Sequence, residues 1–164
     1  MSHKKTERDE ALLQQALSRF NDEGAIKVLT TLDENGAPHP VCKGSLRFNG
    51  ETIESWEILE SSETNRNLTR SIWFDKPIAI LLITPDKKAY KFSVKASRNI
   101  IAGKAFTSAY EAAQARFKGR GIAGVWQYEI IGVKEETAST RISEEAAARP
   151  YFVHLDQLAK RDSK

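Results

Sequence analysis

The sequence is poor in the residues on which most catalytic and metal sites depend. Its 164 residues include one cysteine, Cys42, and three histidines that lie far apart, His3, His39 and His154. A single cysteine excludes an intramolecular disulfide and any metal site built from several cysteines. No His-x-x-x-His pair, G-x-S-x-G motif or G-K-[S/T] loop is present either. Classical side-chain catalysis therefore has little support in this chain.

Long apolar runs and an excess of one charge are also missing. The longest apolar run, Ile78–Ile83, is far too short to cross a bilayer. With 25 basic and 22 acidic residues, the net charge of +3 is too balanced to favour a nucleic-acid groove. A small barrel that binds nucleic acid through Lys91, Lys95 and Arg98 is accordingly a third-ranked interpretation. The polar start of the chain and the single cysteine predict a cytoplasmic protein with no membrane partner.

The pattern that is present predicts one domain over residues 1–164, mainly β with peripheral α-helices. Apolar residues at helical spacing predict an N-terminal helix at about 6–22. An Asn-Gly pair at 49–50 predicts a type I′ hairpin between residues 39–48 and 51–59. Further expected elements are strands at 26–32, 78–83, 90–106 and 125–134, helices at 61–74 and 107–118, and a short C-terminal helical extension at about 143–160. Short antiparallel strands with tight turns favour a six-stranded barrel, because closure removes exposed edges.

Residues 119–124 spell G-x-G-x-x-G, the motif of dinucleotide-binding folds. That motif functions where a strand runs into a helix, so that the helix N-terminus meets the pyrophosphate. In this chain it follows a predicted helix and precedes a predicted strand. The glycines are better explained as a helix stop and a tight path into the last strand.

The most informative run is Ser-Ser-Glu-Thr-Asn-Arg-Asn-Leu at residues 61–68, between a predicted strand and a predicted helix. The first N–H groups of a helix have no internal partners, and the helix dipole favours anions at that end. Hydroxyl groups and a guanidinium in the same turn can add hydrogen bonds to a phosphate. Ser, Thr and Asn are also the usual N-cap residues, so capping alone is the competing interpretation.

Three residues of the preceding strand are ambiguous. His39 lies between two prolines, where it is either an exposed imidazole or part of a ligand site. Cys42 shows no sign of an activated nucleophile and is expected to be a small core residue. Lys43 is either a solvated surface residue or a cation beside an electron-rich ring or a phosphate.

The order of these pieces resembles the split-barrel flavin-binding family typified by pyridoxamine 5′-phosphate oxidase. The resemblance covers roughly residues 10–135. It rests on the strand at 26–32, the Asp-Glu-Asn-Gly-Ala-Pro-His turn at 33–39, the Asn-Gly hairpin, the Asn-Arg-Asn-Leu run at 65–68 and the apolar strand Ile78–Ile83. It implies a six-stranded antiparallel split β-barrel of the FMN-binding type that forms a homodimer, with FMN in clefts between the subunits.

The resemblance also implies a set of cofactor-binding residues. The strand after the Pro-His turn would line the flavin ring, and the next helix start would hold the phosphate. Late strands would supply residues from the partner subunit. In this order the residues are His39, Val41, Cys42 and Lys43; Ser61, Ser62, Thr64, Arg66 and Asn67; Trp126 and Gln127. Family members commonly carry Lys or Arg where Ser62 and Thr64 stand, which leaves deazaflavin and haem as alternative ligands.

The resulting hypothesis is an FMN-dependent oxidoreductase of unknown substrate, with a nicotinamide nucleotide as a possible electron donor. In a flavoenzyme the cofactor performs the redox chemistry, so the lack of a catalytic dyad is compatible with an enzyme. The alternative is a non-enzymatic protein on the same barrel that binds or senses a flavin, a deazaflavin or haem.

Overall fold

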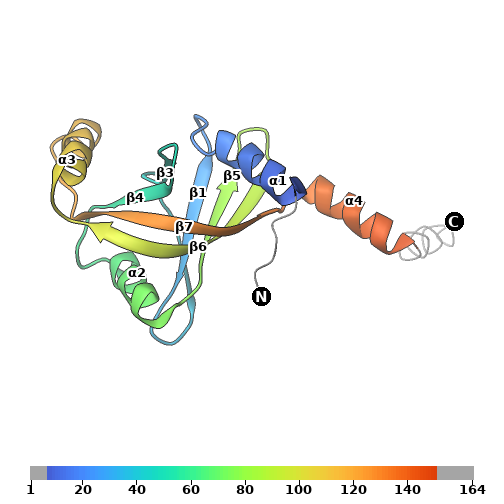
Figure 1. Ribbon diagram of the computed structural model, residues 1–164, viewed down its shortest axis with the longest axis horizontal. Coiled ribbons are helices and arrows are strands. Elements are labelled where there is room, and N and C mark those ends of the chain that lie inside the picture. The colour runs from blue at the N-terminus through green and yellow to red at the C-terminus, as the bar shows by residue number, and fades with distance from the viewer. Residues whose placement is uncertain (1–6, 151–164) are drawn as a thin grey trace, which may run out of the picture.

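Among the described residues, seven antiparallel strands form one curled sheet accompanied by four helices, of which α4 projects away from the sheet (Figure 1). The structure, a computed structural model, describes residues 7–150. Along the sheet the strand order is β2-β1-β5-β6-β7-β4-β3. The elements are α1 Glu7–Ser18, β1 Ile26–Leu32, β2 Pro38–Cys42, β3 Arg47–Phe48, β4 Ile53–Glu57, α2 Glu63–Phe74, β5 Ile78–Ile83, β6 Ala89–Ile100, α3 Lys104–Arg116, β7 Gly124–Glu135 and α4 Ala138–Ala148.

The core lies against one face of the curled sheet, where alternate residues of the central strands are buried. Residues 78, 80 and 82 of β5 and residues 90, 92 and 94 of β6 are buried, whereas their neighbours are partly or fully exposed. Two helices complete this core, with Leu13 and Ala16 from α1 and Leu68 from α2. Strand β5 therefore buries one face fully and the other only in part, although all six of its residues are apolar.

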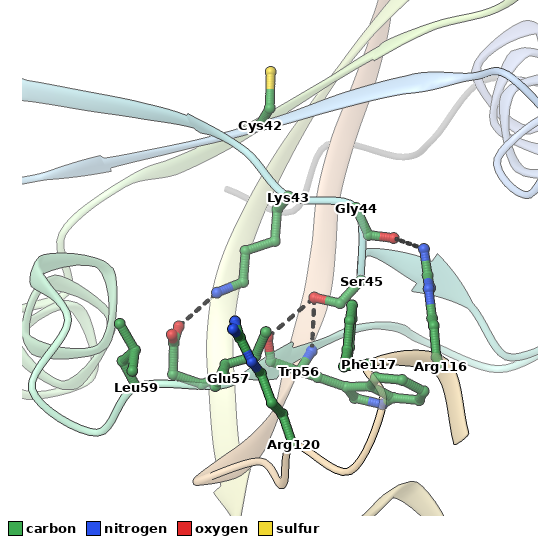
Figure 2. Close-up of a pocket in the computed structure, with 11 residues that line it drawn as sticks. Cys42, Lys43, Gly44, Ser45, Trp56, Glu57, Leu59, Arg116, Phe117 and Arg120 are labelled. Atoms are coloured by element: carbon green, nitrogen blue, oxygen red, sulfur yellow. Dashed lines mark hydrogen bonds and ion pairs between the residues drawn. The ribbon is translucent and has the colours of Figure 1, made fainter. Parts of the chain in front are cut away.

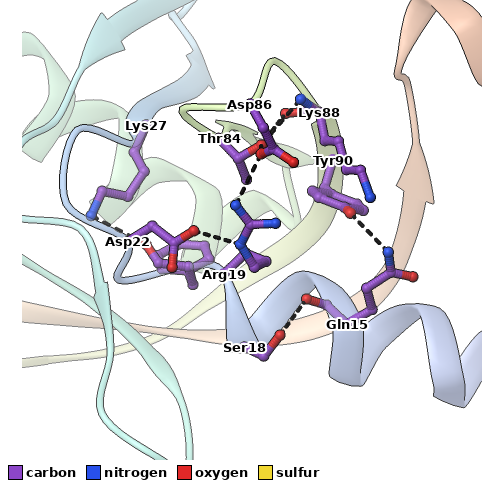
Figure 3. Close-up of polar contacts among 10 residues, drawn as sticks. Gln15, Ser18, Arg19, Asp22, Lys27, Thr84, Asp86, Lys88 and Tyr90 are labelled. Carbon is purple, nitrogen blue, oxygen red and sulfur yellow. Dashed lines mark hydrogen bonds and ion pairs between the residues drawn. The ribbon is translucent and has the colours of Figure 1, made fainter.

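Helix α1 is fixed to the sheet by polar contacts as well as by apolar packing (Figure 3). Its Gln15 donates a hydrogen bond to the Tyr90 hydroxyl at 3.2 Å. Just beyond the helix, the Arg19 guanidinium pairs with Asp22 at 2.5 Å and with Asp86 at 2.9 Å. Asp86 lies in the turn between β5 and β6, so the end of α1 is tied to that turn. The helix ends at Ser18, four residues earlier than predicted.

The hairpin around Asn49 is where the sequence-based prediction is wrong in detail. A type I′ turn needs positive φ at both central residues, but only Gly50 has it, at 101°. Instead the Asn49 side chain accepts hydrogen bonds from the N–H groups of Glu51 and Thr52, which is an Asx turn. The strand predicted over residues 39–48 is also interrupted after Cys42. This break creates β3 and raises the strand count from six to seven, while the mainly antiparallel β fold class is confirmed.

The last two helices begin earlier than predicted. Helix α3 starts at Lys104 after Gly103, whose φ is 86°. Helix α4 starts at Ala138 rather than near 143, and the part of the predicted extension beyond residue 150 lies outside the described residues. Between α3 and β7, Gly119 has a φ of 86°, which agrees with the interpretation of residues 119–124 as a helix stop. Among residues 7–150 no helix is long and apolar enough to cross a membrane.

A buried tyrosine makes the stability of this fold sensitive to alkaline pH. Burial raises the pKa of Tyr128 far above the ordinary value of 10.0, although the Ser55 hydroxyl at 2.8 Å opposes the shift. Above pH 10 the unfolded chain loses this proton and the folded chain keeps it, so stability falls as pH rises. We expect a loss of about 1.4 kcal/mol per pH unit from this one group.

The Tyr128→Phe variant tests this sensitivity, because it keeps the ring and removes the ionisable hydroxyl. Urea unfolding at pH 9.5, 10.5 and 11 should show a shallower loss of stability in the variant than in the parent protein. Parallel slopes would show that Tyr128 is not the source.

Candidate functional site

The start of helix α2 combines a formed N-cap with hydroxyl groups that are still able to donate. The Ser62 side chain accepts a hydrogen bond from the Asn65 N–H at 3.0 Å, which confirms the capping interpretation of this run. A serine hydroxyl that accepts in this way keeps its own O–H to donate. One residue can thus cap the helix and bind an anion.

Strand β2 runs beside this helix start and contacts it through one histidine. The His39 Nδ1 lies 3.3 Å from a Glu63 carboxylate oxygen, and its Nε2 lies 3.4 Å from the Thr64 hydroxyl. Deeper in the same contact, the buried Asn67 amide donates to the Thr31 hydroxyl on β1 at 3.1 Å. Residues 39, 64 and 67, which the sequence placed in one site, are therefore brought together.

The other end of β2 is joined to the segment before α2 by an ion pair. The Lys43 ammonium lies 2.5 Å from a Glu57 carboxylate oxygen, and the side chains are only 12% and 6% exposed. Lys43 is thus not the solvated surface residue of the competing interpretation. Four strand residues span about 13 Å from His39 to Lys43. Residues 39–43 and 57–64 are consequently joined by polar contacts at both ends, and the strip between these contacts is the candidate site.

A cavity of about 410 Å³ opens at the Lys43 end of this site (Figure 2). Figure 2 shows the Lys43 side chain reaching across to Glu57, with Leu59 on one side and Arg120 below. Arg116 also lines the cavity and donates a hydrogen bond to the Gly44 carbonyl at 3.1 Å. The cavity therefore offers an apolar wall together with three cationic side chains.

Two of the residues predicted for the ring end do not have the same environment as Lys43. Cys42 contributes to the cavity lining, but its side chain is exposed and its sulfur points away from the other lining residues in Figure 2. The expectation that Cys42 is a core residue is therefore wrong. Val41 is half-buried and packs against the main core. Alternation along β2 explains why Cys42 differs, since residues 39, 41 and 43 share the opposite face.

The remaining residues of the helix start are accessible to a ligand. Ser61 and Arg66 are exposed, and the Arg66 guanidinium folds back to donate to the Ser61 carbonyl at 3.3 Å. This conformation places the positive charge over the first turn of α2. With the Ser62 hydroxyl it gives a donor set that suits a phosphate. Thr64 is only 6% exposed and its hydroxyl faces His39, so it borders this set from the protein side.

The two residues predicted on β7 have other partners in their own chain. The Trp126 side chain is 1% exposed, and its Nε1 donates to the Asn65 side chain at 2.9 Å. Trp126 thus holds the first turn of α2 against β7. Its predicted contact with a flavin bound to the partner subunit stays a prediction. Gln127 is half-buried and accepts a hydrogen bond from Arg98 at 2.7 Å.

Three residues of the site were not selected from the sequence: Glu57, Arg116 and Arg120. Glu57 belongs to β4, in which all five residues are buried. A glutamate at such a position requires a cationic partner, and this is the signal by which it could have been found. The two arginines come from the end of α3 and the loop after it, which only the tertiary fold brings near β2.

Comparisons with known proteins identify the fold. No protein-family model matches the chain, and no curated protein matches its sequence. An FMN-binding protein from Syntrophomonas wolfei superposes with a TM-score of 0.65 at 18% identity, over 79% of this chain and 88% of that one. HupZ from Group A Streptococcus gives 0.62 at 18% identity, over 76% and 94%. An F420 reductase gives 0.55 at 13% identity, over 74% and 94%.

Identities this low show a shared fold and leave the ligand open. The matched length covers most of this chain, as the resemblance over residues 10–135 predicts. The curled antiparallel sheet with its helices and these structural neighbours agree on one architecture. The chain therefore has the split-barrel fold of the pyridoxamine 5′-phosphate oxidase-like proteins.

Proposed function

We propose that this protein binds FMN in the elongated site between residues 39–43 and 57–64 and acts as a flavin-dependent oxidoreductase. The observation that carries the proposal is that one site has a hydrogen-bonding, cationic end and a partly apolar end. At one end, the α2 N-terminus presents hydroxyls and Arg66. At the other end, the cavity presents Leu59 and the ion pair of Lys43 with Glu57. A ribityl phosphate suits the first end, and a flat, partly apolar ring suits the second.

Each proposed residue has a role that follows from its position. Ser61, Ser62, Thr64 and Arg66 would hold the phosphate, and His39 would keep β2 against the helix start through Glu63. Lys43 would place a fixed positive charge beside the ring, because Glu57 holds its ammonium in place. When bound, the flavin would supply the redox chemistry, and these residues would bind and orient it.

The hydroxyls at positions 62 and 64 depart from the cations common in the family. The α2 N-terminus and Arg66 offer compensating positive charge, which supports a phosphate ligand. An FMN-binding protein and an F420 reductase both share the fold. The alternative function is therefore a non-enzymatic binding or sensing protein for a flavin, a deazaflavin or haem.

A homodimer is part of this proposal, and an apolar surface at the end of α2 supports it. Trp73 is 79% exposed and Phe74 is 67% exposed. A mostly apolar cavity of about 380 Å³ lies just beyond them, lined in part by Pro77, Ile78 and Ile131. Exposed apolar surface of this kind marks interaction sites more often than free surface. We propose that the dimer acts in the cytoplasm with a nicotinamide nucleotide as electron donor.

Reduction of the bound cofactor separates the enzyme from a binding protein. The FMN-loaded protein is mixed without oxygen with NADH or NADPH, and the visible flavin band is followed. Bleaching that is faster than for free FMN under the same conditions is the expected result. A bound flavin that neither nucleotide reduces, but that dithionite does, would favour the binding or sensing role instead.

A further inference from the structure

A second cavity lies on the other side of residues 42–44 from the candidate flavin site. Its volume is about 700 Å³, and it extends from Gly44 and Arg116 to the loop between α1 and β1. Four cationic side chains line it: Lys27, Lys43, Arg47 and Arg116. None of the roles assigned above uses Lys27, and Arg116 lines both cavities.

Two of the four cations have no carboxylate partner among residues 7–150. Lys43 pairs with Glu57, and Arg47 pairs with Glu54. By contrast, within the described part of the chain Lys27 donates to the Phe20 carbonyl at 3.3 Å and Arg116 donates to the Gly44 carbonyl at 3.1 Å. Figure 3 shows Lys27 reaching back along the end of α1. Carbonyl oxygens satisfy hydrogen bonds but leave the positive charges unneutralised.

The electrostatics around Lys27 agree with this geometry. Burial lowers the pKa of Lys27, and the positive charge of Arg116 lowers it further. Two acidic residues also line the cavity, but Asp22 is paired with Arg19 and neither Asp22 nor Glu23 is among the charges that shift Lys27. Two cations that repel each other across one cavity are both relieved when an anion lies between them.

We propose that this cavity binds a small anionic ligand whose phosphate or carboxylate group lies between Lys27 and Arg116. The shared chemistry is an oxyanion that accepts hydrogen bonds from an ammonium and a guanidinium. A cavity of this size holds a molecule larger than the anion itself. The site adjoins the proposed flavin site and shares residues 42–44 and Arg116 with it, whereas Lys27 lines this cavity and not the flavin cavity.

The test is a titration of the full chain with inorganic phosphate and, separately, with succinate, followed by backbone amide NMR. We expect chemical-shift changes at the lining residues Gly24, Ala25 and Gly44. The probe with the lower dissociation constant, phosphate or succinate, identifies the class of anion. Lys27→Met keeps the apolar stem over Phe20, and Arg116→Gln keeps a donor for the Gly44 carbonyl. Each variant should weaken binding about tenfold or more, since each removes a charge-assisted hydrogen bond.

Control variants make every outcome decisive. Lys134→Met and Arg149→Gln remove surface cations that already have acidic partners, so they should leave the affinity unchanged. Equal loss in these controls would mean non-specific association and would overturn the proposal. Shifts confined to residues 61–66 and abolished by Arg66→Ala would also overturn it, while supporting the phosphate end of the flavin site. Equal melting temperatures for Lys27→Met and the parent protein show that the fold is intact.

Discussion

Lys43→Met is expected to lower the free energy of unfolding by about 3–5 kcal/mol. The substitution leaves the Glu57 carboxylate, on a side chain that is only 6% exposed, without the cation that lies 2.5 Å away. An uncompensated buried charge costs far more than the ion pair itself contributes. Urea denaturation at pH 7, followed by circular dichroism, measures the change.

An exposed ion pair provides the matched control for this prediction. Lys95 lies 2.7 Å from Asp75, but the two side chains are 50% and 76% exposed. Lys95→Met should therefore cost no more than about 1 kcal/mol. The double variant Lys43→Met with Glu57→Leu should recover much of the stability that Lys43→Met loses, because no charge remains buried. If Lys43→Met proves as mild as Lys95→Met, the pair is not buried in solution.

Arg66→Ala is expected to weaken FMN binding by about ten- to a hundredfold. That range corresponds to about 1.5–3 kcal/mol for a hydrogen bond to a charged group. The guanidinium folds over the first turn of α2, where the proposed phosphate lies. Arg66 is exposed, so the fold should tolerate its loss. Fluorescence titration of FMN with each protein gives the dissociation constants.

Arg70→Ala is the control for position 66, because it removes the same charge one helical turn further on. Arg70 is directed to Glu34 at 3.3 Å, away from the α2 N-terminus. We expect its FMN affinity to stay within about twofold of the parent protein. One helical turn further from the phosphate, an exposed charge is largely screened by solvent and salt. Equal losses in both variants would indicate only a general electrostatic attraction.

The strands and the helix start were predictable from the sequence because their signals are local. The strand at 26–32 was predicted with the observed bounds of β1, and Asp75 ends α2 as expected. Capping could be predicted for the run at residues 61–68 because it depends on residues three positions apart, and the structure assigns the cap to Ser62. These features need no knowledge of the rest of the fold.

The predictions that were wrong or missing depend on contacts between distant segments, or on side chains that compete with the backbone for hydrogen bonds. The Asn49 side chain captures two backbone N–H groups, and this local competition replaces the expected type I′ turn. Lys43 and Glu57 are 14 residues apart, and Trp126 meets Asn65 from 61 residues away. No periodicity in the sequence indicates such pairs. The cavity beside Lys27 likewise depends on tertiary contacts, because it brings Lys27, Gly44 and Arg116 together from distant parts of the sequence.

The central claim is that the site between residues 39–43 and 57–64 binds FMN. The most direct measurement is gel filtration of the full chain after incubation with equimolar FMN, with absorbance followed in the visible and the ultraviolet. We expect yellow flavin to elute with the protein at about one FMN per chain, and the Arg66→Ala variant to lose it. Protein that elutes colourless, with all the flavin in the small-molecule fraction, would show that the site does not bind FMN.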